Sequence, residues 1–359
     1  MTDETFATTS HLSVAMTTER DDETTTGSGN AMTSSSSRGA DFIFQCAVVI
    51  IGIVGAAANA LVLYAMVASK HHTKQLLIFN QNVLDLCSCL FVLITYTLKL
   101  CNMHLTGTLG YWLCMMILSE NLIWLSVDGS LINLLSIAVE RYLKVVHPAL
   151  GKKLLRKWVI CVVIVLTWIG SATYNMAVVF STSGVIDGVC YGYTFWPSRM
   201  SAAIYGIWHF LSLFVIVLIG FIFCYGRILV VIRRQARVMA AHSSHGHGSS
   251  TADAHSHRVQ ANLVKTMIFV CALYVVAFLP DFMYYLLVNL GVNLSLSGSA
   301  YYIVTFLAFL YICTNPFIYA TKFDPVRREL VRLNICKTSA EPAENDETNN
   351  ACCQCRCIH

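Results

Sequence analysis

The sequence predicts an all-α membrane protein, a seven-transmembrane-helix bundle with a short amphipathic helix after the seventh span. Of its 359 residues, 56% are hydrophobic and only 12% are charged, whereas soluble chains carry about 25% charged residues. Seven apolar stretches are each near or above the roughly 20 residues that an α-helix needs to cross a bilayer. They cover residues 42–68, 76–100, 111–145, 157–180, 202–232, 262–289 and 300–321.

The distribution of Lys and Arg orients these spans. Basic residues gather in the cytoplasmic loops of membrane proteins, and all but four of the 24 Lys and Arg residues fall on one side of the predicted bundle. The exceptions are Arg20, Arg38, Lys99 and Arg199. We therefore expect a plasma-membrane protein with an extracellular N-terminus and a cytoplasmic C-terminus. The net charge of +4 reflects this asymmetry and does not indicate nucleic-acid binding.

Four regions follow from this layout. Residues 1–41 form a Ser/Thr-rich extracellular tail that we expect to be disordered, either O-glycosylated or unmodified. Residues 42–322 form the seven-transmembrane domain, and residues 323–336 an amphipathic helix on the membrane surface. Residues 337–359 form a Cys-rich cytoplasmic tail.

The cysteines outside the apolar stretches divide by compartment. Cys114 opens the third span and Cys190 lies in the loop before the fifth, both on the oxidising face, so we expect a disulfide between them. Cys336, Cys352 and Cys353 lie on the reducing face beside basic residues, which favours S-acylation and contact with membrane lipid. Metal binding is the alternative for the C-terminal cluster.

One glycosylation sequon lies outside the membrane. It starts at Asn293 and falls in the short loop between the sixth and seventh spans. That loop faces outward on the charge argument, so Asn293 is a candidate acceptor.

Several polar side chains interrupt the apolar helices at similar depths. They are Asn59, Asp85, Ser130, Asn133 and Asn315. A carboxylate inside a membrane must be paired, protonated or hydrated, so we expect Asp85 to face the bundle interior. Two interpretations remain open: a site for a cation or water, and a structural polar cluster that joins helices.

Two prolines predict a bundle with a movable inner face. Pro280 and Pro316 lie inside the sixth and seventh spans, where each removes a backbone hydrogen bond and kinks its helix. Arg141, at the inner end of the third span beside Glu140, is placed to change partners if that end opens. The pattern indicates a bundle with two states.

Short motifs in the seven spans carry a family resemblance. In chain order they are Asn59 with Val62, Asn82-Val83-Leu84-Asp85, Ser130, Glu140-Arg141-Tyr142 with Pro148, Trp168, Tyr225, Phe278-Leu279-Pro280 and Asn315-Pro316-Phe317-Ile318-Tyr319. Over residues 42–336 the chain resembles rhodopsin-like (class A) G-protein-coupled receptors. The resemblance implies a receptor and not an enzyme, with an extracellular ligand and a heterotrimeric G protein as partners. Arrestin is a further candidate partner, and no cofactor is implied.

The resemblance also assigns roles to single residues. It implies a coupling switch made of Glu140, Arg141, Tyr142, Tyr225, Asn315, Pro316 and Tyr319. Phe278 and Pro280 form the pivot, and Asp85 with Ser130 a sodium site. The chain departs from the family pattern, with Phe278 in place of Trp and Val217 in place of the proline of the fifth span. Cys114 also lies farther from Arg141 than is usual, which implies an insertion or bulge.

The outer half of the bundle offers a candidate ligand pocket. Its residues are Glu120, Trp124, His209, Asp281, Tyr285 and Tyr301. Aromatic rings with carboxylates suit a peptide or a small molecule that carries a basic group. Phe309 stands where opsins carry their retinal lysine, and Ile123 where amine receptors carry an aspartate, so both classes are disfavoured. The alternative is a seven-helix protein that signals, or acts as a scaffold, without a ligand.

Overall fold

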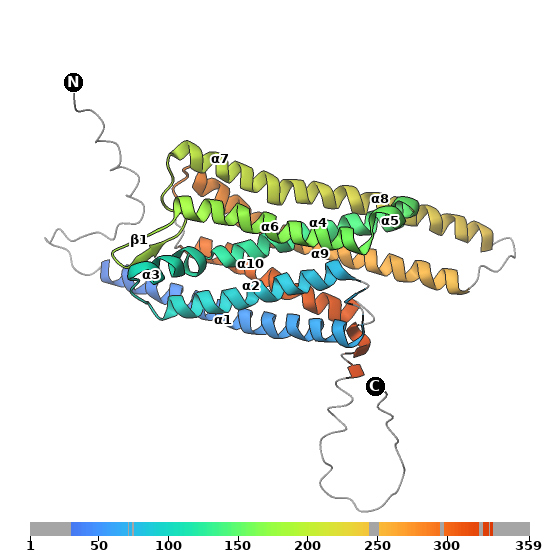
Figure 1. Cartoon of the computed structure of the whole chain (residues 1–359), viewed down its shortest axis with the longest axis horizontal. Helices are drawn as coiled ribbons and strands as arrows, with labels where there is room; N and C mark the ends of the chain where they lie inside the picture. The colour runs from blue at the N-terminus through green and yellow to red at the C-terminus, as the bar shows by residue number, and fades with distance from the viewer. Residues whose placement is uncertain are drawn as a thin grey trace, which may run out of the picture.

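The computed structural model describes residues 30–70, 72–73, 75–243, 251–294, 298–322, 326–329 and 331–332. Within these ranges, the side chains of residues 30–38, 236, 239–243, 251–265, 267 and 319–322 are not described. Seven helical segments in this part of the chain are long and apolar enough to span a membrane. They lie side by side along the long axis of the molecule (Figure 1).

Five of the spans are built from single helices: α1 (Asn30–Ala68), α2 (Leu76–Leu100), α6 (Lys157–Thr182), α9 (Thr251–Asn289) and α10 (Ser299–Lys322). Each of the other two contains a π-helical segment. The third consists of α3 (Gly107–Leu113), η1 (Cys114–Leu118) and α4 (Asn121–Val146), and the fifth of α7 (Arg199–His209), η2 (Phe210–Val215) and α8 (Ile216–Ser243). The short helix α5 (Pro148–Leu154) follows α4.

The start of the bundle differs from the expected boundary, whereas the region after the seventh span is helical as expected. Helix α1 begins at Asn30, so residues 30–41 are helical where the sequence analysis placed the tail. After α10, residues 326–329 and 331–332 are helical, in the region expected to hold the amphipathic helix. Cys336, Cys352 and Cys353 lie outside the described residues.

The helices are apolar on the outside, as the membrane requires. In α6 the buried residues are mostly polar and recur about once per turn, namely Thr167, Ser171, Asn175, Val179 and Thr182. Large apolar side chains of the same helix, such as Leu166 and Ile169, are exposed. Lipid is as apolar as leucine, so burial inside the bundle selects small and polar residues.

The expected insertion in the third span is present. After η1, Glu120 adopts a left-handed backbone conformation with φ of 64°, and α4 starts at the next residue. This conformation is uncommon for a residue other than glycine. In the fifth span, the π-helix η2 lies just before Val217, so the backbone is irregular there although the proline is missing.

A β-hairpin covers one end of the bundle, which we call the hairpin end (Figure 1). Strands β1 (Gly184–Ile186) and β2 (Val189–Tyr191) pair antiparallel through a turn at Asp187 and Gly188, both with positive φ. Such turns suit the twist of a two-residue hairpin. The predicted disulfide is confirmed: Cys190 is bonded to Cys114. It ties β2 to the top of the third span.

Candidate functional site

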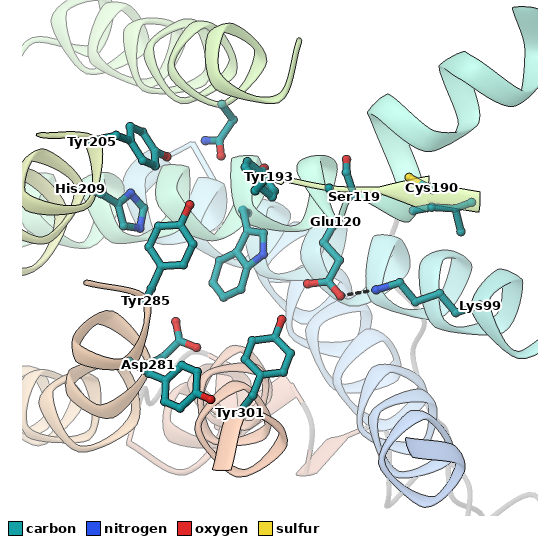
Figure 2. A pocket seen from close by; sticks show the side chains of 15 residues that line it. Lys99, Ser119, Glu120, Cys190, Tyr193, Tyr205, His209, Asp281, Tyr285 and Tyr301 are labelled. Atoms are coloured by element: carbon teal, nitrogen blue, oxygen red, sulfur yellow. Dashed lines mark hydrogen bonds and ion pairs between the residues drawn. The ribbon is translucent and has the colours of Figure 1, made fainter. Parts of the chain in front are cut away.

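A cavity of about 270 Å³ opens at the hairpin end, between the hairpin and the second to seventh spans. All six residues of the candidate pocket line it: Glu120, Trp124, His209, Asp281, Tyr285 and Tyr301. The other lining residues are Lys99, Leu118, Ser119, Asn175, Cys190, Gly192, Tyr193, Tyr205 and Tyr284. The helices bring these side chains together from distant parts of the chain (Figure 2).

An ion pair closes one wall of the cavity. Lys99 Nζ lies 2.5 Å from Glu120 Oε1, and Tyr96 donates a hydrogen bond of 2.8 Å to the same oxygen. The left-handed backbone of Glu120 turns its side chain toward Lys99 (Figure 2). The charge of Glu120 is therefore already balanced within the protein.

Asp281 stands on the opposite side of the cavity with Tyr285 and His209 (Figure 2). Its Oδ1 is 3.5 Å from the hydroxyl of Thr305, a long hydrogen bond. Among the described side chains, no cation pairs with it, since the two ion pairs found there join Lys99 to Glu120 and Lys144 to Glu140. Asp281 is thus a cavity carboxylate without a counter-ion in the described part of the chain.

Aromatic rings form much of the remaining wall. His209 stacks on Tyr205 and Tyr174 at ring distances of 5.7 and 6.0 Å, and its Nδ1 lies 2.9 Å from the Tyr174 hydroxyl. Tyr193, after the hairpin, has a φ of 54°. Burial raises the pKa of the Tyr193 hydroxyl well above its usual range, so it remains a neutral phenol. Electron-rich ring faces attract cations.

An aromatic stack leads from this cavity to the pivot. Phe282 lies 5.0 Å from His209 and 6.0 Å from Phe278, measured between ring centroids. Phe278 is fully buried and lies 5.5 Å from Tyr274, whose hydroxyl donates to the carbonyl of Leu213 in η2 at 2.7 Å. The residue that replaces the usual Trp therefore contacts two rings of its own helix, and Tyr311 of the seventh span at 5.2 Å.

The Asp85 cluster lies in the middle of the bundle. Asp85 is 1% exposed and accepts hydrogen bonds from Ser130 at 2.7 Å and from Asn315 at 2.8 Å, so the expected side chains do meet. Gln81, which the sequence analysis did not single out, also contacts Asp85. Asn59 is in the same region but bonds to Gly55 O of its own helix.

The motif at the inner end of α4 contains an ion pair within the helix. Glu140 Oε1 lies 2.5 Å from Lys144 Nζ, one helical turn onward, and not against the neighbouring Arg141. Adjacent residues of a helix point in different directions, whereas residues four apart share a face. Arg141 Nε is buried and has no hydrogen-bond partner among the described atoms.

The remaining motif and site residues are spread along the bundle. Tyr142 contacts His147 through its hydroxyl at 3.1 Å, and Tyr225 is buried in α8. Pro280 and Pro316 lie inside α9 and α10. The side chain of Tyr319 lies outside the described residues. Asn293 is exposed in the loop after α9.

Seven membrane-spanning helices, a disulfide-tied hairpin and a polar cavity beneath it define a multi-pass membrane protein of the receptor class. The family model described as "7 transmembrane receptor (rhodopsin family)" matches residues 58–319. The chain therefore belongs to the rhodopsin family of seven-transmembrane receptors, which are G-protein-coupled receptors and not enzymes. An extracellular ligand and a G protein are the partners that this family implies. No curated protein matches the chain significantly.

Several cavity residues were missed by the sequence analysis. The sequence identified Lys99 only as one of the few basic residues on the extracellular side. A single Lys near the end of a membrane helix could have predicted a buried acidic partner. Tyr193 and Cys190 reach the cavity through the hairpin, and Tyr205 through the first turns of α7. The spacing of these three residues in the sequence does not predict that they line the cavity.

Proposed function

We propose that this receptor binds a ligand with a basic group in the cavity at the hairpin end, and that binding activates a heterotrimeric G protein at the opposite end. The observation that carries the proposal is Asp281. It is a carboxylate that lines an aromatic cavity and has no counter-ion among the described side chains.

A charged group in a partly dry site needs a partner. A ligand ammonium or guanidinium group would supply it, and the ring faces of Tyr285, Tyr301 and Trp124 would add cation–π attraction. The cavity of about 270 Å³ takes a small molecule or the end of a peptide. Glu120 contributes less, because Lys99 already balances it.

The direction of signalling follows from charge. The hairpin end carries the disulfide, which needs an oxidising compartment. The opposite end carries most Lys and Arg residues, as cytoplasmic loops do. We therefore infer an extracellular N-terminus and a cytoplasmic C-terminus. Asn293 as a glycosylation acceptor, and Cys336, Cys352 and Cys353 as acylation sites that contact lipid, stay predictions of the same topology, as does arrestin as a partner.

The test is a ligand screen on membranes that contain the receptor, with nucleotide exchange by added G protein as the readout. The library pairs basic peptides and amines with neutral analogues of the same shape. We expect activators among the basic members, and loss of their effect in Asp281→Asn at matched surface expression. Activation by neutral analogues alone, or equal potency on Asp281→Asn, would remove Asp281 from the binding site. No response to any compound, together with exchange above that of receptor-free membranes, would favour ligand-independent signalling.

A further inference from the structure

A chain of side-chain hydrogen bonds crosses the middle of the bundle from α6 to Asp85. Trp168 Nε1 donates to Asn80 Oδ1 at 3.0 Å, and Asn80 Nδ2 donates to Asn133 Oδ1 at 3.0 Å. Asn133 Nδ2 then donates to Gln81 Oε1 at 2.8 Å. Gln81 Nε2 lies 3.3 and 3.4 Å from the two carboxylate oxygens of Asp85. We call Asn80, Asn133 and Gln81 the amide chain.

The two ends of this chain fix its direction. An indole N–H only donates and an ionised carboxylate only accepts, so each amide between them must turn its oxygen toward Trp168 and its NH₂ toward Asp85. All three amides are almost fully buried, Asn80 at 5% exposure and Asn133 and Gln81 at 0%. A reversed amide would leave like atoms facing each other in a dry site, which costs free energy. The NH₂ of Gln81 is therefore held against Asp85.

The nitrogen of Gln81 occupies a cup of three oxygens. These are both carboxylate oxygens of Asp85 and the hydroxyl oxygen of Ser130, which also contacts Gln81 Nε2. A hard cation would bind through the same oxygens. Asn315 turns its NH₂, not its oxygen, toward Asp85. The side chains at this site therefore do not fit the sodium ion that the family resemblance implied for Asp85 and Ser130.

Two side chains about one helical turn from Ser130 and Asn315 in the sequence do not compensate for this. The hydroxyl of Ser126 donates to the carbonyl of Leu122 in its own helix at 2.9 Å, and Ile312 is apolar. A sodium ion would have to displace the Gln81 amide and break the amide chain at its last link.

We propose that the Gln81 amide takes the place of a cation at Asp85, so that this receptor holds its central cluster together without sodium. The donors Gln81, Ser130 and Asn315 join α2, α4 and α10 around one carboxylate. The stability of the receptor should then be the same with sodium or with an organic cation that is too large for the cup.

The test measures the thermal unfolding of the purified full-length receptor in sodium chloride and in choline chloride at equal ionic strength. We expect no difference for the wild type. Gln81→Met removes the amide donor, and the flexible thioether can turn away from the three oxygens, so the cup becomes accessible to a cation. This variant should be about 2–4 °C more stable in sodium than in choline.

Two further variants sharpen the result. Gln81→Glu keeps an acceptor for Asn133 while replacing the NH₂ with oxygen, so it should also become more stable in sodium than in choline. It replaces Gln81→Met in the test if that variant does not fold. Asn82→Leu is the matched control, because the buried Asn82 amide donates to Ile78 O and does not contact Asp85. The difference between its Tm in sodium chloride and its Tm in choline chloride should be zero, as in the wild type.

Two results would overturn the proposal. One is a sodium-specific stabilisation of the wild type that Asp85→Asn removes. The other is the absence of a sodium response in every folded Gln81 variant, because the amide would then not be what excludes the ion.

Discussion

Removing the charge of Lys99 should destabilise the receptor while strengthening its binding of basic ligands. Lys99→Met keeps most of the apolar stem but leaves Glu120, whose side chain is 9% exposed, with only the Tyr96 hydroxyl as a partner. The same change frees a carboxylate in the cavity wall. Stability and affinity for a basic ligand should therefore move in opposite directions.

The size of the effect follows from burial. Breaking a fully buried ion pair costs about 3–5 kcal/mol, and breaking an exposed pair about 0–1 kcal/mol. The Lys99 side chain is 28% exposed, so the pair lies between these limits. We expect a loss of about 2 kcal/mol, which for a chain of this length corresponds to a fall in Tm of about 3 °C.

The assay is thermal unfolding of the purified receptor in a double-mutant cycle of Lys99→Met and Glu120→Gln. The double variant should be more stable than the sum of the single effects implies, because each change removes the other's unpaired charge. Lys153→Met, at an exposed position in α5, is the control and should have little effect. Additive effects, or an unchanged Tm in Lys99→Met, would show that the ion pair contributes nothing and that our reading of Glu120 is wrong.

Four other predictions concern the two ends of the bundle. Asp281→Asn should weaken the binding of a basic agonist by about 1–3 kcal/mol in a concentration–response measurement. Its effect should be larger than that of Glu120→Gln, and a larger effect of Glu120→Gln would contradict the prediction. Cys190→Ser breaks a disulfide between cysteines 76 residues apart, so the free energy of unfolding should fall by up to about 4 kcal/mol. Adding Cys114→Ser should lower it no further, which thermal unfolding of both variants would test. Without any ligand, nucleotide exchange should exceed that of receptor-free membranes, because Glu140 pairs with Lys144 instead of Arg141. Arg141→Ala should abolish coupling. An exchange rate equal to that of receptor-free membranes, across several G proteins, would refute the prediction. Gln260→Glu, at a position whose side chain lies outside the described residues, should lower this basal rate about fivefold by giving Arg141 a partner.

The seven spans were predictable because length and hydropathy alone define a membrane helix. Polar residues at matching depths also predicted that Asp85, Ser130 and Asn315 would meet, since an unpaired polar group in a membrane must find a partner. The disulfide was predicted because both cysteines lie on the oxidising side of the membrane. These features depend on the length and hydropathy of each segment and on the depth or side of the membrane where a residue lies, which can be read from the sequence.

Pairings that depend on side-chain direction were not predictable in the same way. Glu140 is next to Arg141 in the sequence, but the helix turns it toward Lys144. Gln81 looked like one more residue of the second span, and only the packing of α2 against α4 reveals its contact with Asp85. The hairpin over the cavity is too short to give a period, so Tyr193 carried no signal. Such contacts are set by several helices together.

The π-helix η1 and the left-handed residue after it affect how parts of this receptor can be exchanged with those of another. An α-helix turns about 100° per residue, so extra residues above Asn121 rotate everything that lies before them relative to α4. A chimera joined within Cys114–Glu120 would inherit a rotated cavity wall, with the Glu120 carboxylate pointing away from Lys99. Grafts should therefore carry residues 107–120 as one block together with the hairpin that the disulfide ties to it, and should join within α4, where the helix is regular again.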